Sequence, residues 1–198
     1  MNAPLHHPLI PASEGVRPLV VTADLYGRMI ESGVLEGRRV ELRDGVIVEM
    51  NAQYVPHMRA KIDLIVALTL AIRSLDNGLR VDGEGSVRLS GLDVPEPDVF
   101  VWQPVDTRTF VPGEQLRLAV EVAASSLGDD LGDKANLYAR SGIPEYWVCD
   151  VEARVVHRHT APNAEGYAER VVIRFDEGIE SATIAGLAID LSRIGQFW

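Results

Sequence analysis

Residues 118–150, LAVEVAASSLGDDLGDKANLYARSGIPEYWVCD, are the most informative part of the sequence for the fold, because their hydrophobic pattern changes twice. This stretch begins inside LRLAVEVA (116–123), a continuous apolar run with a single acid, which is typical of a central strand buried on both faces. A helical pattern follows in DLGDKANLYARSG (130–142), and Gly142 ends it. EYWVCDV (145–151) predicts a second strand. The stretch therefore predicts strand, helix and strand in succession.

The chain beyond this stretch also has the patterns of strands. Asp129 or Asp130 can cap the predicted helix at its N-terminus. A turn at Glu152-Ala153 leads into another strand, ARVVHRHT (153–160). Further strands are predicted at YAERVVIRF (167–175) and SATIAG (181–186), and a last helical turn at LSRIGQFW (191–198).

The preceding part of the chain predicts two helices and a hairpin. Thr22 is a good N-cap for a short helix that Gly33 ends. Asp44-Gly45 divides VELRDGVIVEM (40–50) into two alternating runs, which is a strong hairpin signal. A long helix is predicted from about His57 to Leu75. We expect its core-facing side to carry Met58, Ile62, Ile65, Thr69 and Ile72, which recur at helical spacing.

Two strands around LRVDGEGSVRL (79–89) and one at DVFVWQ (98–103) complete the order. Helix, hairpin, long helix, strands, helix and strands together predict an α/β fold with a central mixed β-sheet flanked by α-helices. Residues 1–18 carry four prolines and no periodicity, so we expect a flexible N-terminal arm there. Residues 19–198 are expected to form one domain.

Composition narrows the function classes. A single cysteine, Cys149, excludes a disulfide within the chain. No apolar stretch reaches the ~18 to 20 residues of a membrane span, and the N-terminus has no signal-peptide core, so a cytoplasmic protein without membrane partners is expected. The net charge of −10 argues against nucleic-acid binding, although a bound cation reverses the local field.

Almost all basic residues of the chain are arginines. The chain has 19 basic residues, and only Lys61 and Lys134 are lysines. Lysine carries a compact charge on a flexible stem, unlike the planar arginine fork. The locations of Lys61 and Lys134 in the fold are therefore of particular interest.

Two acids within apolar runs indicate chemistry. Asp98 opens the strand after Pro97, and Glu121 lies inside 116–123. A buried carboxylate must be paired, protonated or bound to a metal, and two carboxylates from neighbouring strands suit Mg²⁺ or Mn²⁺. Lys134 follows on the helix. Two acids, a metal ion and a lysine together suit phosphodiester hydrolysis, since the lysine can orient the attacking water or stabilise the transition state.

A family resemblance supports this interpretation. PEPDVFVW (95–102), residues 118–150, the hairpin at 40–50 and the helix led by His57 resemble the Uma-two family of endonucleases, within the superfamily named for its Pro-Asp and Asp/Glu-x-Lys motif. The resemblance covers roughly residues 20–190. It implies a restriction-endonuclease-like fold over residues 19–198.

The resemblance also implies roles for individual residues. Asp98 and Glu121 match the metal-binding acids of the superfamily. The simple motif would place its lysine two residues after Glu121, where Ala123 stands, but the family resembled here carries the lysine on the next helix, where Lys134 stands.

Three further residues are candidates for the site, each with a plainer interpretation beside it. Glu41 could ligate the metal or form a cross-strand ion pair. His57 could contact phosphate or serve as a surface or capping group. Asp130 could pair with Lys134 or cap the helix. His157 and His159 could together bind zinc, but no further ligand is evident.

The sequence thus predicts a Mg²⁺- or Mn²⁺-dependent endonuclease that hydrolyses DNA, with Asp98, Glu121 and Lys134 as its catalytic residues, acting as a homodimer. The alternative is a non-catalytic binding or regulatory module on the same fold, which the negative charge favours. A third possibility is a metal-dependent hydrolase of smaller phosphate esters.

Overall fold

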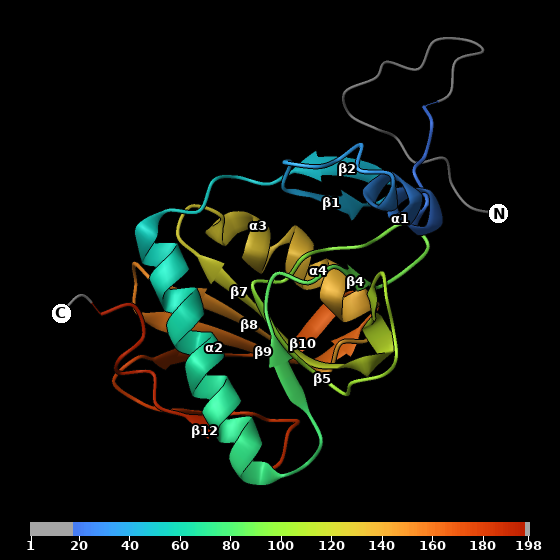
Figure 1. The fold of residues 1–198 in the computed structure, drawn as a ribbon. Coiled ribbons are helices and arrows are strands. Elements are labelled where there is room, and N and C mark those ends of the chain that lie inside the picture. The colour runs from blue at the N-terminus through green and yellow to red at the C-terminus, as the bar shows by residue number, and fades with distance from the viewer. Residues whose placement is uncertain (1–17, 197–198) are drawn as a thin grey trace.

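The computed structural model describes residues 18–196, so the predicted arm at 1–18 lies outside the described residues except for Pro18. A six-stranded mixed sheet is the centre of the fold, with helices on both faces (Figure 1). Within this sheet, only β7 (Leu116–Ala123) and β8 (Glu145–Asp150) pair in parallel, and the other neighbouring strands are antiparallel. In sheet order the strands are β10 (Gly166–Arg174), β9 (Val155–Asn163), β8 (Glu145–Asp150), β7 (Leu116–Ala123), β5 (Val99–Trp102) and β3 (Arg80–Asp82).

The strand–helix–strand unit predicted from residues 118–150 is present, with one difference in its helix. The crossover from β7 to β8 contains two short helices, α3 (Leu127–Leu131) and α4 (Asp133–Arg140). They divide at Gly132, where an added Cβ would lie 2.8 Å from the Gly128 carbonyl oxygen. The predicted cap at Asp129 or Asp130 is wrong, because α3 starts earlier and both acids lie inside it.

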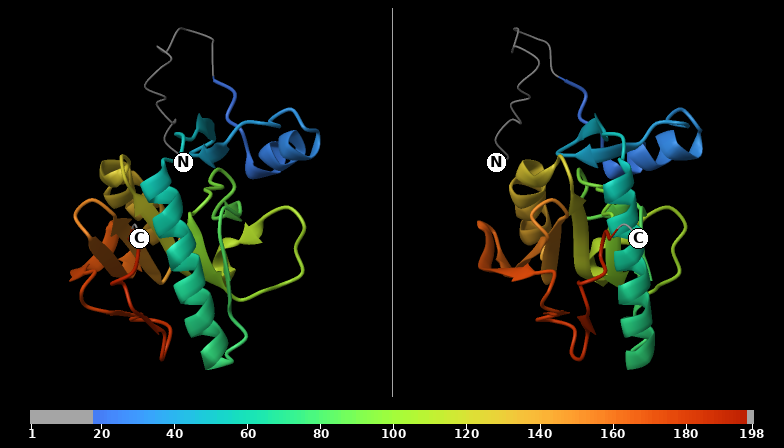
Figure 2. Two further views of the ribbon diagram at one scale, coloured as in Figure 1. Left: turned by 60° about the vertical axis from the view of Figure 1, so that its left-hand side comes forward. Right: turned by 90° about the vertical axis from the view of Figure 1, so that its left-hand side faces the viewer.

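The long helix α2 (Val55–Leu75) covers the opposite face of the sheet from α3 and α4, as the two views of Figure 2 show. The predicted orientation of this helix is partly wrong, since two of the five residues expected to face the core are exposed and Thr69 is half-buried. Ile72 is buried and Ile65 packs against the core, but Met58 and Ile62 are 42% and 50% exposed. The buried positions are instead Ala60, Lys61, Leu64, Leu68 and Ile72. Because α2 is apolar on both sides, periodicity alone did not identify the buried one.

The N-terminal elements form a small unit beyond the N-terminal end of α2 (Figures 1 and 2). Thr22 caps α1 (Ala23–Glu31) as predicted, since its hydroxyl accepts a hydrogen bond from the Leu25 amide at 3.2 Å. The predicted hairpin is β1 (Val40–Arg43) and β2 (Val46–Glu49). Asp44 and Gly45 between them both have positive φ, as a tight hairpin turn requires.

The remaining elements are short, and they correct two predictions. β4 (Val87–Arg88) pairs with β6 (Val111–Pro112), the 3₁₀ turn η1 (Gly113–Gln115) follows, and β11 (Ile179–Glu180) pairs with β12 (Ala188–Ile189). Residues 181–186 form the turn between β11 and β12 and not a strand, and residues 191–196 form turns and not a helix. Over residues 18–196, no helix is long and apolar enough to cross a membrane.

Candidate active site

The pairing of β5 with β7 brings the two predicted acids together. Val99 faces Val120 in the antiparallel register, so the next pair outward is Asp98 and Glu121. The Asp98 amide donates a hydrogen bond to Glu121 Oε2 at 3.4 Å. The expectation that these acids come from neighbouring strands is therefore met.

Glu121 is the more deeply buried of the two acids, with a side chain 2% exposed. The Tyr138 hydroxyl donates to Glu121 Oε1 at 3.0 Å, and the Lys134 ammonium lies 3.1 Å from the same oxygen. Burial raises the pKa of Glu121 to about 8, against the opposing attraction of Lys134 and with a further contribution from Asp98. Glu121 therefore favours a proton or a cation near neutral pH.

Lys134 reaches the acids from α4, and its side chain is only 7% exposed. Its ammonium also lies 3.5 Å from Asp130 Oδ1, and the Ser126 hydroxyl donates to the other Asp130 oxygen at 2.5 Å. Burial disfavours the charged form of Lys134, but the attraction of Glu121 and the neighbouring acids outweighs burial and raises its pKa. Burial likewise raises the pKa of Asp130. Helix α4 thus supplies the lysine that the simple motif would place on the strand, at the position of Ala123.

Asp98 is held by donors from three elements. Its Oδ2 lies 3.1 Å from His57 Nε2 and accepts from the Val122 amide at 2.9 Å, while Gln53 Nε2 donates to Oδ1 at 3.3 Å. Burial alone would raise the pKa of Asp98, but the hydrogen bonds from His57 and Val122 and the charge of Lys134 lower it on balance. Asp98 and Glu121 therefore have opposite pKa shifts, as in sites where neighbouring carboxyl groups have different tasks.

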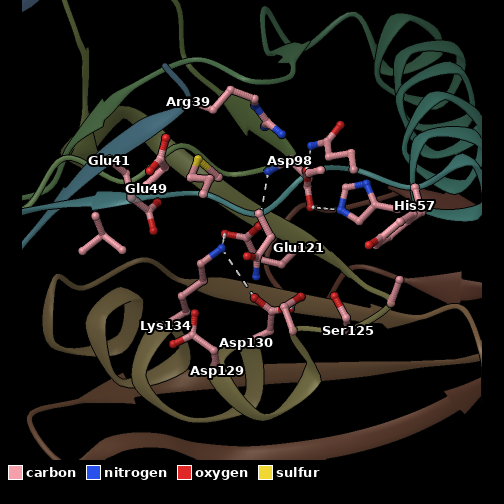
Figure 3. Close-up of a pocket in the computed structure, with 18 of the residues that line it drawn as sticks. Arg39, Glu41, Glu49, His57, Asp98, Glu121, Ser125, Asp129, Asp130 and Lys134 are labelled. Carbon is pink, nitrogen blue, oxygen red and sulfur yellow. Dashed lines mark hydrogen bonds and ion pairs between the residues drawn. The ribbon is translucent and has the colours of Figure 1, made fainter. Parts of the chain in front are cut away.

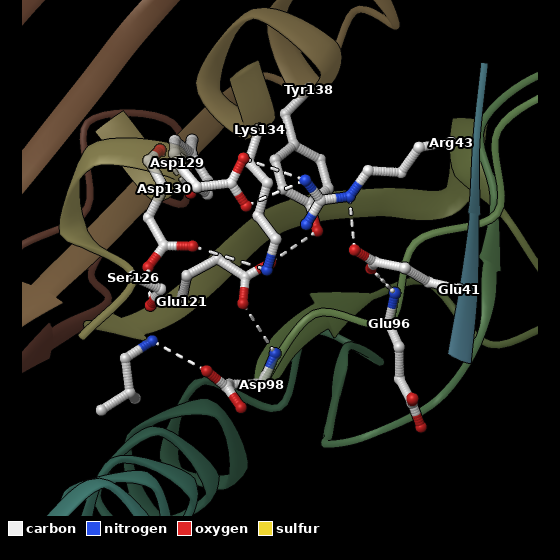
Figure 4. A network of polar contacts seen from close by, with 12 residues as sticks. Glu41, Arg43, Glu96, Asp98, Glu121, Ser126, Asp129, Asp130, Lys134 and Tyr138 are labelled. Atoms are coloured by element: carbon white, nitrogen blue, oxygen red, sulfur yellow. Dashed lines mark hydrogen bonds and ion pairs between the residues drawn. The ribbon is translucent and has the colours of Figure 1, made fainter. Parts of the chain in front are cut away.

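The β1–β2 hairpin closes one side of the site, and Glu41 and Arg43 reach in at the right of Figure 4. Glu41 is buried and accepts a hydrogen bond from Arg43 Nε. Its ion pair therefore lies within β1, and not across to the neighbouring strand as the plainer interpretation predicted. The Glu96 amide also donates to Glu41, at 3.3 Å. Arg43 Nη1 donates to both carboxylate oxygens of Asp129 at 2.9 Å, which ties the hairpin to α3.

A pocket of about 190 Å³ opens between the hairpin and the sheet (Figure 3). This volume equals about six water molecules, enough for a metal ion, its waters and one phosphate. All six residues predicted for the site line this pocket: Glu41, His57, Asp98, Glu121, Asp130 and Lys134.

The two carboxylates of the site suit a magnesium or manganese ion. Across residues 18–196, no three or more His, Cys, Asp or Glu side chains are arranged as a metal-binding group, which also leaves the His157–His159 zinc alternative without support. Asp98 and Glu121 would supply two carboxylates. Mg²⁺ is commonly held by one or two carboxylates, with waters and substrate phosphate completing the shell. The high pKa of Glu121 fits a position that a cation stabilises.

Sequence reasoning missed several residues of the site. Arg43 lies two positions after Glu41 on the same strand face, a spacing that could have identified it. Gln53 had no signal, since it lies in the loop before α2. Lys61 was notable only for its rarity, and the structure places its ammonium 4.0 Å from Asp98 Oδ1.

Comparison with known proteins agrees with this architecture. A crystal structure described as "a putative nuclease belonging to DUF820", from Anabaena variabilis, superposes with a TM-score of 0.63 over 80% of this chain and 90% of that chain, at 13% sequence identity. At that identity the likeness shows the fold. No curated protein matches the chain.

A family model covers most of the sequence. The model of the Uma2 family, described as "Putative restriction endonuclease", matches residues 24–192. This range contains the central sheet, the hairpin and every predicted site residue. The chain therefore belongs to the Uma2 family.

Proposed function

We propose that this protein is a metal-dependent endonuclease that hydrolyses phosphodiester bonds in DNA. The observation that carries the proposal is the group formed by Asp98 and Glu121 on paired strands with the Lys134 ammonium 3.1 Å from Glu121, all facing one pocket. Membership of a family described as restriction endonucleases supports the reaction class.

Asp98 and Glu121 would hold one Mg²⁺ or Mn²⁺ ion. When bound, the ion would supply Lewis acidity that lowers the pKa of the attacking water and neutralises charge on the scissile phosphate. Lys134 would orient that water or stabilise the charge that develops on phosphorus. His57 fixes the Asp98 carboxylate, and Tyr138 fixes that of Glu121, so the two ligands are held before substrate arrives.

The proposal includes a homodimer, in which two copies act on the two strands of a duplex. Sedimentation of the purified chain with and without DNA tests this part separately. A sedimenting monomer in both conditions would contradict it.

A second candidate function is favoured by one observation. The carboxylate oxygens of Asp98 and Glu121 already have protein donors: the former contacts His57, Gln53 and the Val122 amide, and the latter Tyr138 and Lys134. Together with the net charge of −10, this satisfied network suits a non-catalytic binding or regulatory module.

One experiment separates these functions. The wild type and Glu121→Ala are incubated with plasmid DNA, RNA and a phosphodiester of nucleotide size, each with Mg²⁺, Mn²⁺ or EDTA. We expect metal-dependent cleavage of DNA by the wild type and none by the variant, with circular dichroism showing both to be folded. Cleavage of the small ester alone would support a phosphoesterase. Full activity of Glu121→Ala would refute the assigned site.

A further inference from the structure

Lys61, the other of the two lysines, approaches Asp98 from helix α2, whereas Lys134 approaches Glu121 from helix α4. It projects from α2, and its side chain is 6% exposed. The ammonium is 2.6 Å from Gln53 Oε1, 2.6 Å from Glu84 Oε1 and 4.0 Å from Asp98 Oδ1. Three oxygen atoms from three separate segments thus surround one buried cation.

The turn that carries Glu84 is built tightly against Asp98. A Cβ at Gly83 would lie 2.7 Å from the Asp98 carbonyl oxygen, so only glycine fits there without movement. Glu84 has φ of 56°, a strained conformation for a residue with a side chain, and its amide donates to the Pro97 carbonyl at 3.2 Å. The hydrogen bond from Lys61 lowers the pKa of Glu84 despite its partial burial. The backbone thus fixes the turn that places Glu84 beside Lys61 and Asp98.

Lys61 is placed differently from Lys134. Lys134 lines the pocket, whereas Lys61 is buried outside it and approaches Asp98. Lys61 is therefore placed to act on the reaction through Asp98, as a positioning residue.

We propose that the Lys61 ammonium occupies a second cation position beside Asp98, so that the site takes one divalent ion and not two. This inference rests on the proposed function. Two carboxylates and an amide oxygen make a suitable ligand set for Mg²⁺ or Mn²⁺ once the ammonium is removed. The fixed charge of Lys61 also disfavours a second cation, because like charges repel strongly where water is scarce.

Counting bound Mn²⁺ tests the proposal. Free Mn²⁺ is measured by electron paramagnetic resonance during titration of full-length wild type, Lys61→Ala, Lys61→Arg and the double variant Lys61→Ala with Glu84→Ala. We expect one ion per chain in the wild type, two in Lys61→Ala, and one in both Lys61→Arg and the double variant. Arg39→Ala is the matched control, because Arg39 also contacts Glu84, at 3.4 Å, without a contact to Asp98. It should keep one ion.

Each outcome has a distinct meaning. One ion in the wild type and still one in folded Lys61→Ala would overturn the proposal for Lys61 and leave the proposed function standing. Two ions in the wild type would have the same meaning. No binding to wild type would contradict the proposed function, on which the inference depends. If Lys61→Ala does not fold, Lys61→Gln decides: loss of the charge should tighten Mn²⁺ binding about tenfold or add a second ion. An unchanged or weaker affinity with one ion would overturn the proposal.

Discussion

Replacing Glu121 by glutamine should stabilise the metal-free protein at neutral pH. The pKa of Glu121 is raised by burial from 4.5 to about 8, so the folded state retains a proton that the unfolded chain releases. Between these two values the wild type loses stability as the pH rises, because the unfolded state gains the free energy of ionisation. Glutamine is neutral in both states, so Glu121→Gln does not suffer this loss.

The magnitude follows from the interval between pH 4.5 and pH 7.0. These 2.5 pH units at 1.36 kcal/mol each give a difference of at most about 3 kcal/mol at pH 7.0. At pH 5.0 the same arithmetic leaves less than about 1 kcal/mol. The amide should preserve the hydrogen bond from Tyr138.

Urea denaturation in EDTA at both pH values measures the effect, with Trp147 in the core as the fluorescent reporter. We expect Glu121→Gln to unfold at a higher urea concentration than the wild type at pH 7.0 and at a similar one at pH 5.0. A variant clearly less stable than the wild type at pH 7.0 would contradict this expectation. It would mean that Glu121 is ionised in the folded state and stabilised by its ion pair with Lys134.

Three further predictions follow from single contacts. Lys134→Met should reduce DNA cleavage about a hundredfold or more through loss of transition-state stabilisation. The control Arg140→Met, on the exposed side of the same helix, should cleave DNA like the wild type. Equal cleavage rates for the two variants would refute the catalytic role of Lys134. Gly132→Ala should destabilise the fold by about 1 to 3 kcal/mol in thermal denaturation, because its Cβ would meet the Gly128 carbonyl; an unchanged melting temperature would contradict this. Glu145→Ala should cost about 2 to 4 kcal/mol in urea denaturation, since it removes a buried carboxylate that accepts hydrogen bonds from the β11–β12 turn. A loss below about 1 kcal/mol would contradict that role.

Much of the fold could be predicted because its signals are local. The apolar run of β7, the Asp44-Gly45 turn and the helical spacing before Gly142 each depend on neighbouring residues. The orientation of α2 could not be predicted, because Met58 and Ile62 are as apolar as the residues that pack on the sheet. The division at Gly132 was not predicted, because a single glycine within a helical pattern is only a weak signal for a break.

The site was predictable where strand pairing alone places a residue. Asp98 and Glu121 are adjacent because β5 and β7 pair in register. Arg43 shares a strand face with Glu41, a local signal, but its contact with Asp129 depends on how the hairpin sits against the sheet. The position of Lys61 beside Asp98 likewise depends on how α2 packs, which no short stretch of sequence encodes. The two lysines nevertheless both lie at the site, so their rarity was informative.

Binding of a divalent cation by Asp98 and Glu121 underlies the proposed function. It is measured by calorimetric titration of Mg²⁺, with and without DNA, into the wild type and into the double variant Asp98→Ala with Glu121→Ala. We expect binding by the wild type that the folded double variant loses. Equal binding by both proteins would place the metal elsewhere, and no binding by the wild type in either condition would contradict the proposed function and favour the non-catalytic module.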